Sequence, residues 1–178
     1  MDFQSLQADL NFEPITGYLA SDHRPINLPL ISHIVDNLYV GGHSDKADVG
    51  DFFSHIFSLY VWGQPYRSDK TVVVHRSVRM LDSMTEDTSL VDEIVPEIVE
   101  ALEAGGNVLV HCQAGINRSN LTAALVLREW KGLTSAEAIA MLREKRGDIV
   151  LANKGFERYL LSLDNPEPHK DYPGDGVE

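Results

Sequence analysis

Short apolar runs and helically spaced apolar positions alternate along most of this chain. Four runs rich in Val, Ile and Leu predict β-strands, at residues 32–42, 55–62, 71–81 and 107–111. Apolar side chains recur at helical spacing in four further segments, which predict helices at residues 90–102, 119–131, 134–146 and 155–163. Thr134 and Glu137 form a capping box at the third of these helices. Strands that alternate with helices are typical of an α/β domain with a largely parallel sheet, whose ligands bind beyond the carboxyl ends of the strands.

The two ends of the chain lack this pattern. Residues 1–31 carry scattered Pro, Asn and Asp with weak periodicity, so we expect an N-terminal arm that wraps the domain or is partly mobile and adds no chemistry. Residues 165–178 combine acids and prolines with few apolar side chains, which predicts a disordered acidic tail. A chain of 178 residues, 43% of them hydrophobic, is long enough for one compact domain, which we place at residues 32–164.

Charge and composition exclude several classes of function. A formal net charge of -12 works against binding to nucleic acid or to an anionic membrane surface, because both depend on Lys and Arg. No apolar run approaches the ~20 residues of a membrane span, and neither a disulfide pair nor a secretion signal is visible. We therefore expect a cytoplasmic protein. The histidines are dispersed without ligand spacing, so no metal site is predicted.

The only cysteine lies where a predicted strand meets a predicted helix, in the stretch VLVHCQAGINRSN at residues 108–120. A loop between a strand and a helix N-terminus directs backbone N–H groups into one concavity, and the helix dipole adds positive charge. Such a loop binds an anion, and the same field stabilises a thiolate, which would make Cys112 a nucleophile. Gly115 lets the backbone turn and approach the ligand closely.

Three neighbours of the cysteine complete this chemistry. The planar guanidinium of Arg118 can grip two oxygens of a phosphate at once. Ser119 can donate a hydrogen bond to the sulfur, which favours the charged thiolate and helps it to leave later. Because a thiolate stabilised in this way needs no general base, His111 is expected to orient the loop from behind through a hydrogen bond.

The stretch HCQAGINRS resembles the His-Cys-x5-Arg-Ser/Thr signature of the cysteine-dependent protein tyrosine phosphatases, and its AG pair resembles the dual-specificity branch. The likeness extends over about residues 32–163, through DNLYVGG at residues 36–42 and LANKGFERYLLSL at residues 151–163. It implies a protein tyrosine phosphatase-like fold with about five strands. It also implies phosphate binding by the loop and a supporting role for Asn153. The loop residues are Gln113, Ala114, Gly115, Ile116, Asn117 and Arg118.

The function implied by this resemblance is hydrolysis of phospho-Tyr and phospho-Ser/Thr in phosphoproteins through a cysteinyl-phosphate, without a cofactor. The cleft would be shallow, with Tyr39 on its wall. The general acid must come from the loop after the third predicted strand, where Asp82, Glu86 and Asp87 are the candidates. Asp82 is favoured because it directly follows the strand and because its distance to Cys112 in the sequence resembles that of the family.

Two other functions stay open. Asn117 stands where dual-specificity enzymes usually carry Ser, and an Asn at this position also occurs in the RNA 5′-triphosphatases of capping enzymes. The acidic chain favours a phosphoprotein over RNA. A pseudophosphatase that binds phosphoproteins without hydrolysing them usually lacks the cysteine, the arginine or the acid, and here all three are present.

Overall fold

A mixed five-stranded sheet forms the centre of the protein. The computed structural model describes residues 2–9, 12–49, 52–63, 66, 74–83 and 88–165. The strands of the central sheet are β3 (Ile31–Val35), β4 (Leu38–Gly41), β5 (His55–Ser58), β6 (Val74–Ser77) and β7 (Val108–His111). They lie in the order β3-β4-β7-β5-β6, in which β4, β7, β5 and β6 are parallel and β3 runs antiparallel to β4. The prediction of an α/β fold with a largely parallel sheet of about five strands is confirmed.

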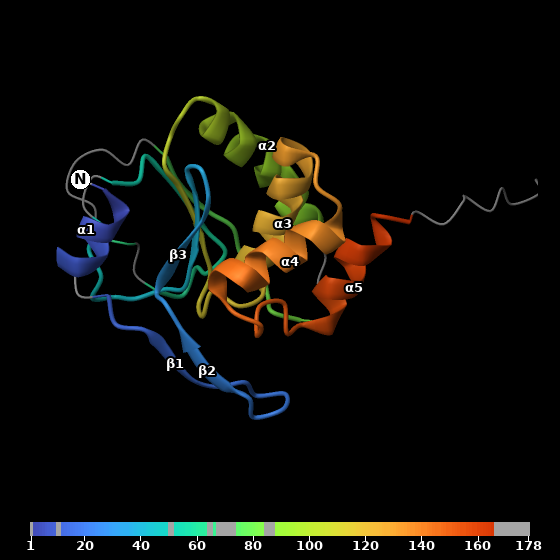
Figure 1. Ribbon diagram of the computed structural model, residues 1–178, viewed down its shortest axis with the longest axis horizontal. Helices are drawn as coiled ribbons and strands as arrows, with labels where there is room; N and C mark the ends of the chain where they lie inside the picture. The colour runs from blue at the N-terminus through green and yellow to red at the C-terminus, as the bar shows by residue number, and fades with distance from the viewer. Residues whose placement is uncertain are drawn as a thin grey trace, which may run out of the picture.

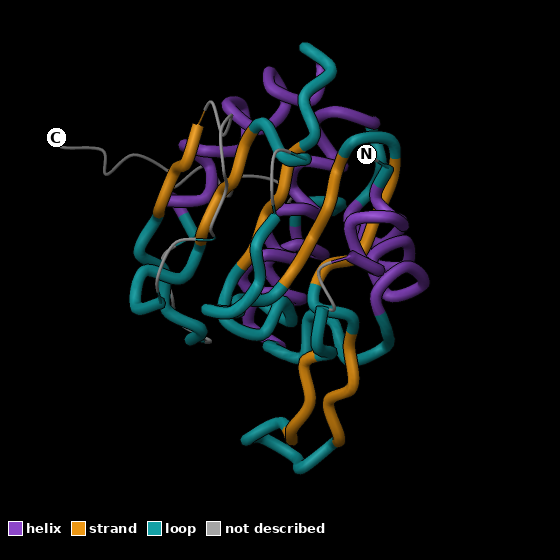
Figure 2. The backbone as a smooth tube through the Cα atoms, turned by 90° about the vertical axis from the view of Figure 1, so that its left-hand side faces the viewer, coloured by secondary structure: helices purple, strands orange, loops and turns teal. Residues whose placement is uncertain are grey.

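Helices cover both faces of this sheet (Figures 1 and 2). The larger layer contains the four helices expected from the sequence, which are α2 (Ser89–Glu103), α3 (Arg118–Lys131), α4 (Ser135–Arg146) and α5 (Lys154–Ser162). The short helix α1 (Phe3–Asp9) lies against the other face. Because side chains alternate along a strand, Val108 and Val110 of β7 pack in the larger core, and Leu109 packs in the core under α1. All three side chains are fully buried, as a parallel strand covered on both faces requires.

The expected single strand at residues 32–42 is wrong. This segment is an antiparallel hairpin of β3 and β4, in which Val35 pairs with Leu38 across a turn at Asp36 and Asn37. Asp36 has a φ of 48°, a left-handed conformation that Asp tolerates better than most residues. The Asn37 side-chain amide donates to the Gly106 carbonyl (2.5 Å) and so ties the turn to the segment before β7. The apolar runs on both sides of this turn hid it in the sequence.

The N-terminal arm contains three elements that its weak periodicity did not reveal. Besides α1, it forms an antiparallel hairpin of β1 (Ile15–Tyr18) and β2 (Pro25–Leu28), which projects from one end of the central sheet (Figure 2). Leu6 of α1 is 1% exposed, so the arm contributes to the buried core. The predicted acidic tail, apart from Asn165, lies outside the described residues. None of the described helices has the length and apolar character needed to cross a membrane.

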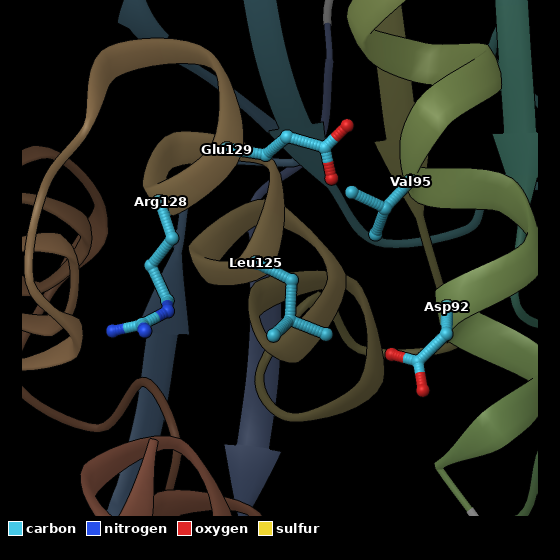
Figure 3. Close-up of a pocket in the computed structure, with 5 residues that line it drawn as sticks. All are labelled: Asp92, Val95, Leu125, Arg128 and Glu129. Carbon is cyan, nitrogen blue, oxygen red and sulfur yellow. The ribbon is translucent and has the colours of Figure 1, made fainter. Parts of the chain in front are cut away.

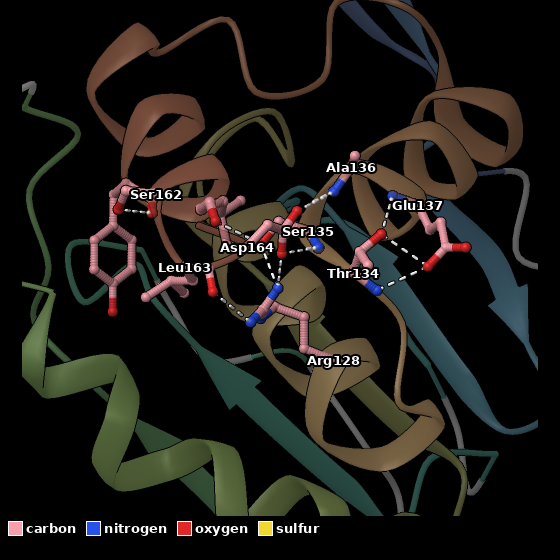
Figure 4. A network of polar contacts seen from close by, with 10 residues as sticks. Arg128, Thr134, Ser135, Ala136, Glu137, Ser162, Leu163 and Asp164 are labelled. Carbon is pink, nitrogen blue, oxygen red and sulfur yellow. Dashed lines mark hydrogen bonds and ion pairs between the residues drawn. The ribbon is translucent and has the colours of Figure 1, made fainter. Parts of the chain in front are cut away.

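A polar network fixes the start of α4 against the end of α5 (Figure 4). The predicted capping box is present, since Thr134 accepts from the Glu137 backbone N–H and the Glu137 carboxylate accepts from the Thr134 N–H. Asp164 accepts from the backbone N–H groups of Ser135 (2.7 Å) and Ala136 (3.1 Å), and it pairs with Arg128 of α3. The start of α4 and the end of α5 are therefore both held to α3.

Candidate active site

The cysteine loop connects the central strand β7 to the N-terminus of α3. Cys112 follows β7 directly and is only 2% exposed, and Arg118 is the first residue of α3. The Cys112 sulfur lies 3.4 Å from the Ser119 hydroxyl, which is the contact expected of a serine that hydrogen bonds to the sulfur. Gln113 lies on the surface, Ala114 and Asn117 are partly buried, and Ile116 is buried. The structure therefore brings the predicted nucleophile, serine and loop residues together.

The carbonyl groups of the loop point outward, where neighbouring segments donate to them. The backbone N–H of His43 donates to the Gln113 carbonyl (2.8 Å), and that of Leu151 donates to the Ile116 carbonyl (2.9 Å). The Gly115 carbonyl accepts from Asn120 Nδ2 (2.8 Å) and from Arg146 Nε (2.7 Å). In a trans peptide the N–H group points opposite to the carbonyl of the preceding residue. The N–H groups of Ala114, Ile116 and Asn117 therefore point away from these donors and can donate to an anion.

Gly115 is required by both its backbone conformation and its neighbours. Its φ is +65°, which disfavours any residue with a Cβ atom. A Cβ at this position would lie 2.6 Å from the carbonyl carbon of Gly41 and would also strike Arg146. The close approach of the loop to β4 therefore depends on this glycine.

Arg118 is buried, and backbone carbonyls of the segments that follow β5 and β6 hold its guanidinium in place. Its Nη1 donates to the carbonyls of Leu59 and Met80, both at 3.0 Å, and the residue is 5% exposed. Its Nε is also buried and has no hydrogen-bond partner within the described part of the chain. A buried N–H on a guanidinium that is fixed in this way can donate a hydrogen bond to an oxyanion.

A second buried arginine supports the loop from outside, and sequence reasoning missed it. Arg146 is 3% exposed and donates to Gly115 through Nε and to Ser32 Oγ (3.0 Å) and the Val40 carbonyl (3.1 Å) through Nη1. Burial lowers the pKa of Arg146 to about 10, and the nearby Cys112 opposes this effect, so the guanidinium is charged at neutral pH. In the sequence, Arg146 resembles any basic residue in the last turn of a helix, so no pattern distinguished it.

His111 does not make the expected orienting contact. Neither ring nitrogen has a hydrogen-bond partner among the residues that the structure describes. The ring instead stacks on His43 at 5.8 Å and meets the edge of Tyr66 at 4.9 Å. Burial, reinforced by the neighbouring His43, lowers the pKa of His111 to about 3, so its ring is neutral and supports the loop by packing.

Asp82 lies at the edge of the loop in a cluster with two asparagines. Its Oδ2 accepts from Asn117 Nδ2 (2.9 Å) and its Oδ1 accepts from Asn153 Nδ2 (2.8 Å). The Asn117 oxygen accepts from the Asn153 backbone N–H (2.9 Å), and the Asn153 oxygen accepts from the Gly155 and Phe156 N–H groups to cap α5. These contacts join the candidate acid, the cysteine loop and α5. The alternative acids, Glu86 and Asp87, lie outside the described residues.

Aromatic residues border the site differently from what the sequence suggested. Tyr39 is 6% exposed and packs among Phe3, Phe52 and Phe53 in the core under α1, so its expected place on the wall of the cleft is wrong. An aromatic ring beside the site belongs to Tyr60, whose centroid lies 5.9 Å from Arg118 Cζ. Tyr60 follows β5, at the carboxyl end of a strand adjacent to β7.

A separate pocket of about 340 Å³ lies between α2 and α3 (Figure 3). Asp92 and Val95 line it from α2, and Leu125, Arg128 and Glu129 line it from α3. None of these residues belongs to the cysteine loop or its supporting contacts. Within the described ranges, no three His, Cys, Asp or Glu side chains are grouped as a metal ion would need.

Comparisons with known proteins agree with this geometry. The family model described as "Dual specificity phosphatase, catalytic domain" matches residues 53–165. "Dual specificity protein phosphatase 1" of Arabidopsis thaliana is 34% identical over 153 residues, which cover 82% of this chain and 74% of that protein. "Dual specificity protein phosphatase 26" of Bos taurus is 31% identical over 154 residues, which cover 84% of this chain and 71% of that protein. The crystal structure of human DUSP28 aligns with a TM-score of 0.65 at 19% identity, over 75% of this chain and 94% of that one, a likeness of fold.

Proposed function

The chain belongs to the dual specificity phosphatase family and is a cysteine-dependent protein phosphatase, and on that premise we propose that it hydrolyses phospho-Tyr and phospho-Ser/Thr through a cysteinyl-phosphate. The observation that carries the proposal is the surrounding of Cys112. Neighbouring segments donate to the carbonyls of Gln113, Gly115 and Ile116, which leaves the N–H groups that follow them free to donate to an anion. Arg118 is buried, and its Nε has no hydrogen-bond partner among the described residues. This arrangement fits the oxygens of a phosphate monoester whose phosphorus lies in line with the thiolate.

In the first step, the Cys112 thiolate attacks phosphorus, and the bond between phosphorus and the leaving oxygen breaks. Asp82, in its protonated form, gives its proton to that oxygen, so the alcohol or phenol leaves neutral. The loop N–H groups and Arg118 hold the three equatorial oxygens while negative charge redistributes among them. The product of this step is a cysteinyl-phosphate and an ionised Asp82.

In the second step, water attacks the phosphorus and the sulfur leaves as a thiolate. Asp82 accepts the proton of that water, which returns the carboxyl group to its starting form. Ser119, whose hydroxyl lies 3.4 Å from the sulfur, donates a hydrogen bond that stabilises the departing thiolate. Since the loop and Arg118 supply the charge stabilisation, the proposed steps use no metal and no organic cofactor.

The breadth of substrates is proposed from the position of the acid. Asp82 is exposed and lies at the edge of the loop, so a short phospho-Ser or phospho-Thr side chain could bring its leaving oxygen near the carboxyl group. Tyr39 is buried elsewhere and so does not deepen the entrance. We therefore expect a shallow cleft that also admits the longer phospho-Tyr.

The test is vanadate-sensitive hydrolysis of p-nitrophenyl phosphate, followed by matched phospho-Tyr, phospho-Ser and phospho-Thr peptides. Cys112→Ser should abolish turnover and still bind phosphopeptides, because a serine hydroxyl is scarcely ionised near neutral pH. Residual activity above a few per cent would refute the nucleophile. Binding without turnover by the unmodified chain would instead indicate a pseudophosphatase, and a 5′-triphosphate RNA hydrolysed faster than every phosphopeptide would indicate an RNA enzyme.

A further inference from the structure

The β1–β2 hairpin of the N-terminal arm packs directly on the phosphate loop. Leu28 of β2 shares a buried cluster with Ile116 of the loop and with Ile149. Partly buried residues extend this contact, namely Leu19, Ile26, Ala114 and Ala152. A Cβ at Gly42 would strike Ile15 of β1 and would lie 3.1 Å from the backbone of Ala114. The hairpin is therefore fixed against the loop, although it lies outside the part of the chain that matches the family model.

A groove of about 600 Å³ separates the turn of this hairpin from the edge of the active site. The turn forms one wall with Leu19, Ala20, Ser21, Asp22 and Arg24. The opposite wall consists of Asp82, Asn117, Ala152, Asn153 and Lys154. Because Asn117 belongs to the cysteine loop and also lines the groove, the groove adjoins the loop where the phosphate would bind.

The charged groups at the rim of the groove are already paired within the chain. Arg24 Nε lies 2.8 Å from Asp22, and Lys154 Nζ lies 2.6 Å from Glu157. Each cation is already paired with a carboxylate, so its attraction for an acidic residue of the substrate is weakened. Leu19, Ala20 and Ala152 offer apolar surface between these pairs. The lining thus favours an uncharged, apolar side chain.

We propose that this groove binds the part of the substrate polypeptide that flanks the phosphorylated residue, and that it prefers an apolar side chain there. The inference rests on the proposed phosphatase function and adds a substrate class to it. The N-terminal hairpin then acts as a specificity element, because it supplies one complete wall of the groove. A small phosphate ester fills only the loop and makes no contact with that wall.

The experiment compares kcat/KM for a peptide with leucine on both sides of phospho-Tyr, the same peptide with serine on both sides, and p-nitrophenyl phosphate. The unmodified chain should prefer the leucine peptide by about fivefold or more, since burial of part of a leucine side chain favours binding by this order. Ala20→Trp fills the groove from an exposed position and removes no core side chain. It should lower the ratio of leucine-peptide to p-nitrophenyl phosphate kcat/KM by about tenfold or more.

Tyr18→Ala is the matched control, because Tyr18 lies on the same hairpin, is 72% exposed and does not line the groove. It should change that ratio less than about twofold. Equal use of the two peptides, or an unchanged ratio in Ala20→Trp, would overturn the inference. The affinities of the Cys112→Ser variant for the leucine and serine phosphopeptides test the groove without turnover. If the unmodified chain proves inactive, the proposed function is refuted, and these affinities still decide whether the groove binds the flanking residues.

Discussion

The bond between Asn117 and Asp82 predicts that an amide in the phosphate loop positions the general acid. Asp82 is exposed, and two amide groups hold its carboxylate, Asn117 at 2.9 Å and Asn153 at 2.8 Å. Asn117 is itself oriented, because its oxygen accepts from the Asn153 backbone N–H. Asn117→Ala removes one of the two anchors of the acid. It leaves the loop carbonyls, Arg118 and Cys112 with their own partners.

The size of the effect follows from the strength of one hydrogen bond. A single bond of this kind contributes about 0.5–1.5 kcal/mol. If that free energy keeps Asp82 in its productive orientation, its loss lowers the rate by about 2–13-fold, at ~1.36 kcal/mol per tenfold. Asp82→Asn removes the proton donor altogether and should cost about 10²–10⁴-fold. Both losses should be large for alkyl phosphates and small for aryl phosphates, whose leaving groups need little protonation.

The assay is a double-mutant cycle of kcat on an alkyl and an aryl phosphate, with Asn117→Ala, Asp82→Asn and both together. If Asn117 acts through the acid, its substitution should have little further effect once Asp82 is gone. Asn27→Ala, at an exposed position of β2, serves as the control and should be neutral. An unchanged effect of Asn117→Ala in the Asp82→Asn background would refute the positioning role. If Asp82→Asn itself behaves like the unmodified chain, Glu86 or Asp87 becomes the candidate acid.

Three further substitutions test other parts of the structure. Arg118→Lys should lose most of both substrate binding and rate in steady-state kinetics. A point charge cannot replace a planar guanidinium that also donates to two carbonyls. Near-normal kinetics would refute the proposed role of Arg118 in binding phosphate. Ser119→Ala should slow breakdown of the cysteinyl-phosphate more than its formation, which predicts a pre-steady-state burst, and a linear time course would argue against it. The Ser135 N–H and other donors lower the pKa of Asp164 from 3.8 to about 2, so the stability it provides is complete above about pH 4 and is lost as the pH falls toward 2. Melting temperatures between pH 2 and 5 should therefore fall less steeply in Asp164→Asn, and parallel curves would contradict this.

The regular part of the fold could be predicted because its local signals agree. The buried strand β7 and the helices α2 to α5 have apolar patterns of the right period, and the capping box marks the start of α4. The hairpin of β3 and β4 was missed because its turn consists of two polar residues, Asp36 and Asn37, between apolar runs. The β1–β2 hairpin was missed for another reason. Its strands are largely exposed, so they have no periodic pattern of apolar residues that would predict them from the sequence.

The candidate site divides in a similar way. That the residues from Cys112 to Ser119 lie close together could be predicted, because one short loop between β7 and α3 contains them. Contacts across the fold could not be predicted. Arg146 reaches Gly115 from a helix that begins far downstream, and Asn117 meets Asp82 only because the sheet order places β6 and β7 on either side of β5. Such contacts depend on tertiary structure, and no local spacing encodes them.

An acidic chain would be expected to repel its proposed ligand, a phosphate dianion. The positions of the cations in the structure explain how it could still bind one. The partly buried Arg128 and Arg143 and the exposed Lys154 pair with carboxylates, so they contribute little attraction for an anion. Arg118 and Arg146 are buried beside the loop, and backbone carbonyls rather than carboxylates accept most of their hydrogen bonds. Burying a cation that has no carboxylate partner is costly, and an oxyanion in the loop would offset part of that cost. We therefore expect the local charge at the site, rather than the net charge of the chain, to govern binding of the proposed ligand.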